Sequence, residues 1–218
     1  GDIVPVCACS ALTGVGIARM MDLMAKYLPS PAHDGIEHDG FNPRTGEAQV
    51  RVCKDDQPFS ALVFKTIADP FVGKMSFFKV MSGELRNDMT LKNLSTESSE
   101  KFAHFYVMRG KKQTEADTLC CGDIGLVNKL ASTGTGDILC AAGANIEVKP
   151  IEYPKPCFSR AIKPKAKGDE EKISAGLNKL ASEDRTFSLV RNHETHQTII
   201  SGVGEQHINV ICSKLEGK

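Results

Sequence analysis

The sequence predicts a multidomain chain of β and α+β class, in which a small antiparallel β-barrel precedes a split β-α-β domain. Two observations predict the barrel. Residues 59–67 are rich in β-branched and aromatic side chains, and further short strand-like runs follow at regular spacing to about residue 146. The second domain is predicted because strand-like and helix-like runs after residue 157 follow the order β-α-β-β-α.

The barrel is predicted over residues 58–150. Its first strand ends near Asp69, because Pro70 cannot donate to a sheet ladder and Gly73 permits a positive φ. A second strand covers residues 75–81 and ends at a turn containing Gly83. Later predicted elements are a turn and short strand at 85–91, a strand at 101–108 and a polar connector at 109–115.

Two Gly-Asp pairs close the predicted barrel, at Gly122-Asp123 and Gly136-Asp137. Each pair predicts a tight turn whose carboxylate accepts nearby backbone N–H groups. Phosphate binding is the alternative for the glycine-rich GTGD run, but the Asp137 carboxylate would repel a phosphate.

Residues 151–218 form the second predicted domain, separated from the barrel by Pro154 and Pro156. Its predicted elements are a strand at 158–162, a helix from an Asp169 N-cap to about 182, two strands around a turn at 193–196, and a helix after Gly204. This is a ferredoxin-like domain that lacks its last strand.

The N-terminal residues predict only one strand and one helix. Residues 3–9 are apolar, as in a parallel strand, and a helix from Ile17 stops at Pro29. Residues 31–57 are rich in Pro, Gly, His and Asp and predict a linker, in which His33 and His38 are solvated loop side chains rather than ligands.

Composition limits the function classes. Lys+Arg and Asp+Glu number 27 each, so any RNA contact depends on local patches rather than on net charge. No apolar run reaches the ~20 residues that span a membrane, and no signal peptide is recognisable, so we expect a cytoplasmic protein without a membrane partner. The chain opens without Met, so we expect it to be a piece of a longer protein.

Eight cysteines are scattered without a CxxC pair. They are therefore expected to be reduced, buried thiols, with no zinc site.

Several motifs carry a family resemblance. DPFVGK followed by FFKVMSGEL resembles the start of domain II of bacterial translation elongation factor G, and residues 121–127 and 134–139 resemble later elements of that domain. SEDRTF and ETHQTIISGVGEQH resemble its domain III. The resemblance runs from Pro5 to the C-terminus and implies a multidomain translational GTPase that drives ribosomal translocation.

The resemblance assigns residues 1–30 to the end of a GTPase domain, 31–57 to a linker, 58–150 to domain II and 151–218 to a truncated domain III. Ser10, Ala11 and Leu12 stand in place of the guanine-proximal SA motif, with a role only in the intact protein. GTP or GDP and Mg are implied for that protein. This sequence has neither G-x-x-x-x-G-K-[ST] nor NKxD, so we expect no cofactor and no catalytic residue in it.

Two basic groups are candidates for contact with small-subunit ribosomal RNA and proteins, with a solvated surface as the alternative. The resemblance also implies contacts with the missing GTPase and C-terminal domains of the same protein. The RNA candidates are Arg109, Lys111 and Lys112 in the barrel, and Arg160, Lys163, Lys165 and Lys167 after it. Candidates for coupling between domains are Asp69, Phe71, Gly73, Ser201, Gly202, Gly204 and Glu205.

Two other functions are alternatives. A paralogous ribosomal GTPase could act in ribosome recycling or in protection against an antibiotic. A small metal-dependent or hydrolytic enzyme could use the HETH and GEQH runs, but the histidine spacing of three in HETH differs from that of HExxH. Glu205 and His207 are better explained by helix capping and packing.

Overall fold

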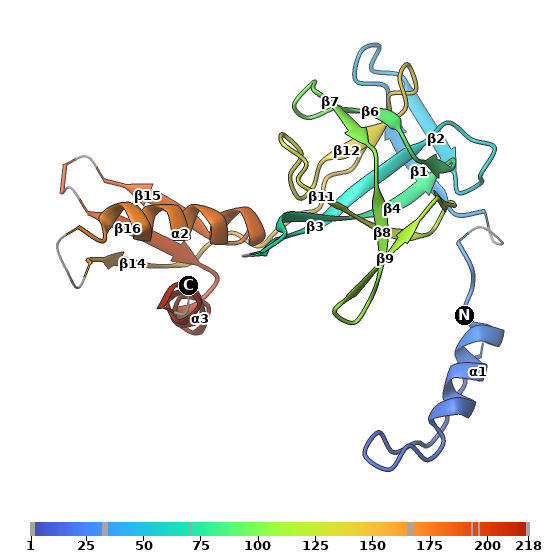
Figure 1. The fold of residues 1–218 in the computed structure, drawn as a ribbon, viewed down its shortest axis with the longest axis horizontal. Helices are drawn as coiled ribbons and strands as arrows, with labels where there is room; N and C mark the ends of the chain where they lie inside the picture. Colours follow the sequence, from blue (N-terminus) through green and yellow to red (C-terminus); the bar gives the residue numbers. More distant parts are fainter. Residues whose placement is uncertain are drawn as a thin grey trace.

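The structure is a computed structural model that describes residues 3–31, 35–69, 71–164, 168–192, 194–195 and 197–216. Figure 1 shows an N-terminal helix, a strongly curled sheet and a small domain with helices beside a sheet. No helix in this part of the chain is long and apolar enough to cross a membrane.

The curled sheet has eight antiparallel strands in the order β7-β6-β12-β3-β4-β11-β8-β9, which confirms the predicted fold class. A two-stranded β10-β5 ladder accompanies it. The strands are β3 (Ser60–Asp69), β4 (Gly73–Ser82), β5 (Leu85–Arg86), β6 (Met89–Asn93), β7 (Ser99–Phe102), β8 (Phe105–Arg109), β9 (Lys112–Ala116), β10 (Thr118–Leu119), β11 (Ile124–Asn128) and β12 (Ile138–Cys140).

The single strand predicted at 101–108 is wrong, because the structure breaks it into β7 and β8. Phe102 pairs with Met89, whereas Phe105 pairs with Ala116. Both phenylalanines are completely buried in the barrel core, where Phe102 meets Phe78 edge to face at 5.8 Å between ring centroids. Residues three apart in one strand face opposite sides, so burying both rings requires the break.

Residues 109–115 are also more regular than predicted. The expected polar connector contains most of β9, which pairs with β8 over its whole length, and Gly110 takes a φ of 59° in the turn. Only Gly110 and Lys111, in the turn between β8 and β9, belong to neither strand.

Residues 31–57, which were predicted as a linker, contain strands that were not predicted. They contain β1 (Glu37–Phe41) and β2 (Ala48–Val52), and β1 also pairs with β13 (Glu147–Val148) at the end of the barrel. His38 is therefore a half-buried strand residue, not a solvated loop histidine, and His33 lies outside the described residues.

The C-terminal domain has the predicted order and nearly the predicted bounds. It consists of β14 (Phe158–Ile162), α2 (Glu170–Glu183), β15 (Ser188–Arg191), β16 (Thr198–Gly202) and α3 (Glu205–Glu216), with sheet order β14-β16-β15. Leu177, Leu180, Ile208 and Ile211 of the two helices pack with Ile200. Asp169 precedes α2, but its side chain makes no capping bond, so the predicted N-cap is wrong in that respect.

At the N-terminus, α1 (Ile17–Tyr27) confirms the predicted helix, but the strand predicted at residues 3–9 is wrong. A parallel strand needs a neighbour for its backbone hydrogen bonds, and in the described part of the chain none pairs with it. Val6 is accordingly 92% exposed.

The cysteines are only partly as predicted. The structure shows all eight as free thiols. Cys53, Cys121 and Cys140 are buried, whereas Cys7, Cys9, Cys120 and Cys157 are exposed, and Cys212 is intermediate.

Candidate functional site

Three of the predicted RNA-contact cations meet at the tip of the β8–β9 hairpin. Arg109 lies directly opposite Lys112, and Lys111 is in the turn. All three are exposed, and none has an ion pair to another described residue. Like charges opposite each other destabilise a hairpin, so an anionic partner would relieve this repulsion.

In the second basic group, unlike at the hairpin tip, one cation is already paired with an acidic residue. Arg160 on β14 donates from Nη2 to Glu205 Oε1 at 2.6 Å, and its guanidinium lies 5.3 Å from the centroid of the Phe158 ring. The structure thus joins two residues that were predicted for different roles. Lys163 is exposed just after β14, while Lys165 and Lys167 lie outside the described residues.

Asp69, Phe71 and Gly73 form the turn between β3 and β4. Asp69 Oδ1 accepts the N–H groups of Val72 and Phe71, each at 2.8 Å, and these bonds lower the pKa of the Asp69 carboxyl. Gly73 has a φ of 88°, and the Phe71 side chain is 96% exposed.

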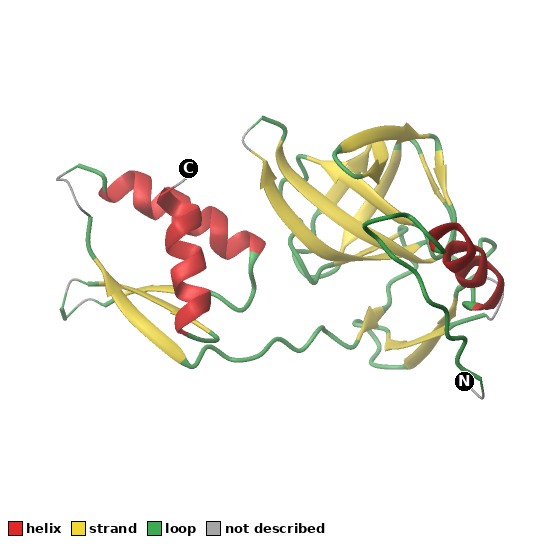
Figure 2. Ribbon diagram, turned by 90° about the horizontal axis from the view of Figure 1, so that it is seen from below, coloured by secondary structure: helices red, strands yellow, loops and turns green. Residues whose placement is uncertain are grey.

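The barrel contacts the C-terminal domain at Ala68, one residue before this turn, where α2 packs across β3. The Ala68 N–H donates to Glu183 Oε1 at 2.8 Å. Glu183 lies in the SEDRTF run that carries the family resemblance, but it was not predicted as a contact residue, because the run does not indicate what its side chain meets. Figure 2 shows that the chain also joins these domains through an extended segment between β13 and β14.

A cleft of about 440 Å³ lies beside this contact. Thr66 and Thr135 line it from the barrel, Tyr153 from the connecting segment, and Arg185 and Lys214 from the C-terminal domain. The cleft therefore depends on both domains staying in contact.

Ser201, Gly202, Gly204 and Glu205 connect β16 to α3. Ser201 Oγ lies 2.7 Å from Ser159 Oγ, and a Cβ at Gly202 would lie 2.6 Å from His207 Nδ1. No described residue lies within 4 Å of such an atom at Gly204. These contacts all lie within the C-terminal domain.

His207 ties the start of α3 to the end of α2. The Val203 N–H donates to His207 Nδ1 at 3.2 Å, so that nitrogen carries no proton and Nε2 donates to Asp184 Oδ2 at 2.8 Å. Burial raises the pKa of Asp184, but hydrogen bonds from Thr186 and His207 outweigh this and lower it. The packing role predicted for His207 is confirmed. His193 and His196 lie outside the described residues.

Ser10, Ala11 and Leu12 form a local turn before α1. Ser10 Oγ accepts the Thr13 N–H at 3.3 Å, and the Leu12 side chain is 97% exposed. Because the sequence has no phosphate-binding loop, these residues do not by themselves fit a GTP or Mg site.

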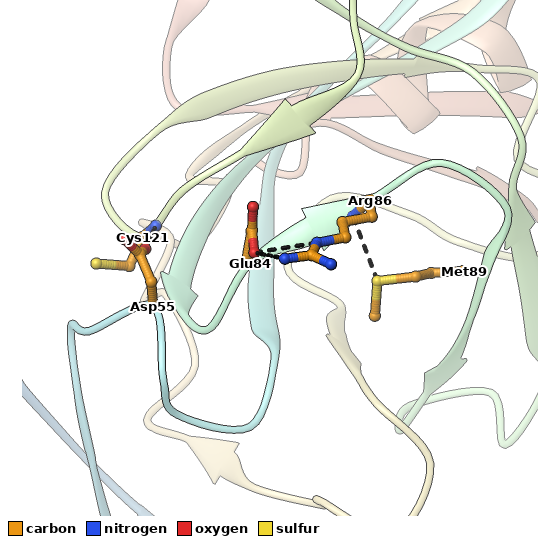
Figure 3. Close-up of polar contacts among 5 residues, drawn as sticks. All are labelled: Asp55, Glu84, Arg86, Met89 and Cys121. Atoms are coloured by element: carbon orange, nitrogen blue, oxygen red, sulfur yellow. Dashed lines mark hydrogen bonds and ion pairs between the residues drawn. The ribbon is translucent and has the colours of Figure 1, made fainter.

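A polar cluster that sequence reasoning missed lies beside β5 (Figure 3). Asp55 Oδ1 accepts the Cys121 N–H at 2.8 Å, and Glu84 Oε2 accepts from Arg86 Nη2 at 2.7 Å. Burial, together with Cys53 and Asp55, raises the pKa of Cys121 to about 12. The thiol stays protonated and is a poor nucleophile at neutral pH, so we assign the cluster to structure.

Comparison with known proteins covers both domains. Residues 58–142 match elongation factor G domain 2, and residues 153–218 match elongation factor G, domain III. A crystal structure of a protein from Thermus thermophilus is similar with a TM-score of 0.78 and 27% identity, over 97% of this chain and 29% of that chain.

These two domains in this order define a translation factor. More narrowly, both belong to elongation factor G, so the chain is an elongation factor G-type translation factor sequence and the resemblance is confirmed. It spans 29% of the length of the Thermus chain.

Proposed function

We propose that this chain belongs to an elongation factor that promotes ribosomal translocation, with the barrel and the C-terminal domain acting as its ribosome-binding and coupling parts. The observation that carries the proposal is the contact of α2 with β3, since it joins two domains of one translation-factor family through the Ala68–Glu183 bond. A change in this packing would change the surface that the two domains present together.

Binding would rest on the exposed cations. The hairpin tip at Arg109 and Lys111 can donate charge-assisted hydrogen bonds to phosphates of small-subunit ribosomal RNA, and Lys163 can do so from the C-terminal domain. GTP or GDP and Mg would belong to a GTPase domain of a longer protein, and no step through them is derived from these residues.

Chemical footprinting of ribosomes with this chain at low and moderate salt tests the binding. We expect protection of small-subunit RNA that weakens with salt, and a smaller salt dependence in the double variant Arg109→Gln, Lys111→Gln. The control Arg44→Gln, Lys54→Gln removes the same charge from other exposed positions. Equal protection by both double variants would contradict the role of the hairpin tip.

Translocation itself needs a separate test in a longer protein that contains this chain. We expect Glu183→Ala to slow single-turnover movement of messenger RNA more than it weakens ribosome binding, because the variant loosens the α2–β3 contact. Unchanged movement with a loosened contact would contradict the coupling role.

A further inference from the structure

One side of the β1–β2 hairpin is polar, and this side lies against the outer face of the barrel. His38 of β1 pairs with Arg51 of β2, and Gln49 lies two residues away on the same face. β2 contacts β4, where Lys79 faces outward because its neighbours Phe78 and Val80 point into the barrel core. All four polar side chains are half-buried, so each still exposes part of its surface to solvent.

Three hydrogen-bonding atoms of the hairpin and of the neighbouring residue Asn145 have no partner among the described residues. Arg51 donates from Nη2 to Ala144 O at 3.5 Å, but its Nε is shielded from solvent and has no acceptor. Gln49 Oε1 and Asn145 Oδ1 are likewise shielded and unpaired, and Asn145 is only 8% exposed. Buried polar groups are rarely left unpaired, so the site indicates a missing partner.

The charges show which partner is missing. His38 lies opposite Arg51, and the charge of Lys79 acts on its ring; none of the three has an ion pair to a described acidic residue. Glu37 and Asp39 alternate onto the other face of β1. Burial, and then the charge of Lys79, lower the pKa of His38, as expected where cations gather without a counter-ion.

An anion with several oxygens would satisfy this set of donors. The guanidinium of Arg51 presents a fork of N–H groups that matches phosphate geometry, and Lys79 supplies an ammonium. Half-turn rotations of the Gln49 and Asn145 amides would replace each unpaired oxygen by an NH₂ donor. A divalent cation, in contrast, would be repelled by the positive charges of Arg51 and Lys79.

We propose that the space between the β1–β2 hairpin and β4 binds a phosphate group, held by Arg51, Lys79 and His38 with the amides of Gln49 and Asn145. The site uses none of the cations proposed above for contact with ribosomal RNA. It therefore stands independently of the proposed function.

NMR of the histidine ring signals in the full chain tests the proposal. Inorganic phosphate added at constant ionic strength should shift the His38 signals saturably and raise the pKa of His38, whereas chloride should not. Arg51→Gln and Lys79→Gln should each weaken the affinity about tenfold or more, because each removes a charge-assisted hydrogen bond to the phosphate. Arg109→Gln, the same change on an exposed turn, should leave it unaltered.

The phosphate could belong to a free phosphate compound or to an RNA backbone, and a short RNA without terminal phosphates distinguishes them. Competition by this RNA would assign the site to a phosphodiester, and no competition would assign it to a free phosphate. If Arg51→Gln fails to fold, Lys79→Gln alone decides. The proposal is overturned if His38 does not respond to phosphate, responds equally to chloride, or responds unchanged in Lys79→Gln.

Discussion

At the residue scale, single carboxylates organise the loops of the barrel. Asp123 Oδ2 accepts the Cys120 N–H at 2.9 Å, and Asp137 Oδ2 accepts the Gly134 N–H at 2.7 Å. Both bonds confirm the turns predicted for the Gly-Asp pairs. Glu100 has the same role for residues 131–133, but it precedes them by about thirty positions, so no local pattern predicted it.

Glu100 gives a prediction for the pH dependence of stability. It accepts from Ser132 N, Ser132 Oγ and Thr133 Oγ1 at 2.8, 2.9 and 3.1 Å. Burial raises its pKa, but these bonds outweigh burial and place the pKa below its ordinary value of 4.5. The stabilisation is therefore full above the unfolded pKa and is lost as the pH falls through the folded one.

We expect Glu100→Gln to cost about 1–3 kcal/mol at neutral pH, because the hydrogen bonds lose their charged acceptor. Urea unfolding of both proteins at neutral and acidic pH would measure this, with the difference shrinking in acid. A difference that is independent of pH would contradict the assignment.

Gly83 gives a second prediction at this scale. Its φ is +73°, and an added Cβ would lie 2.6 Å from Gln57 O and 2.7 Å from the Phe59 backbone. Gly110 has a φ of +59° with nothing within 4 Å. Gly83→Ala should therefore destabilise the chain more than Gly110→Ala, which has only the backbone strain of about 1–2 kcal/mol. Thermal unfolding compares them, and equal losses would refute the packing argument.

At the element scale, the two edges of β3 differ in how far along the strand they pair with a neighbouring strand. Its first residues pair with β12 on one side and β4 on the other, whereas among the described residues its second half pairs with β4 alone. The free edge of that half faces α2, and Glu183 accepts its Ala68 N–H. Covering an exposed strand edge in this way prevents pairing with other chains.

This arrangement predicts a local change in hydrogen exchange. In Glu183→Ala, the Ala68 amide should exchange faster, by an amount equivalent to about 1.5–3 kcal/mol, because it loses its charged acceptor. Glu171→Ala at the exposed first turn of α2 is the matched control. Protection of Ala68 that is equal in both variants would show that the bond does not hold the domains together.

At the scale of the whole molecule, the barrel begins earlier than its family match. Cys53 belongs to the barrel core, and β1 pairs with β13 beside the buried Ile146 and Val148. Helix α1, in contrast, has no buried residue.

Two truncations follow from this contrast. A chain of residues 31–218 should unfold at nearly the same urea concentration as the full chain. A chain of residues 58–218 should be less stable by several kcal/mol, because each large apolar side chain that becomes exposed costs about 1.5–3 kcal/mol. Equal stability of the two truncated chains would show that residues 31–57 are only a linker.

Short-range sequence patterns determined much of the fold of this protein. The sequence by itself predicted the barrel class, the β-α-β-β-α order of the C-terminal domain and the Gly-Asp turns, because periodicity, proline, glycine and short-range hydrogen bonds act over a few residues. The same signals carried the family resemblance.

Only the tertiary structure decided the rest. Three features join residues that lie on different elements. They are the pairing of Gly40 with Val148, the break that buries both Phe102 and Phe105, and the Ala68–Glu183 bond. Such contacts depend on which surfaces meet after the chain has folded, and polar residues such as His38 and Arg51 show no pattern until a second strand lies opposite them. Short-range sequence patterns do not contain that information, because it arises from packing between distant segments.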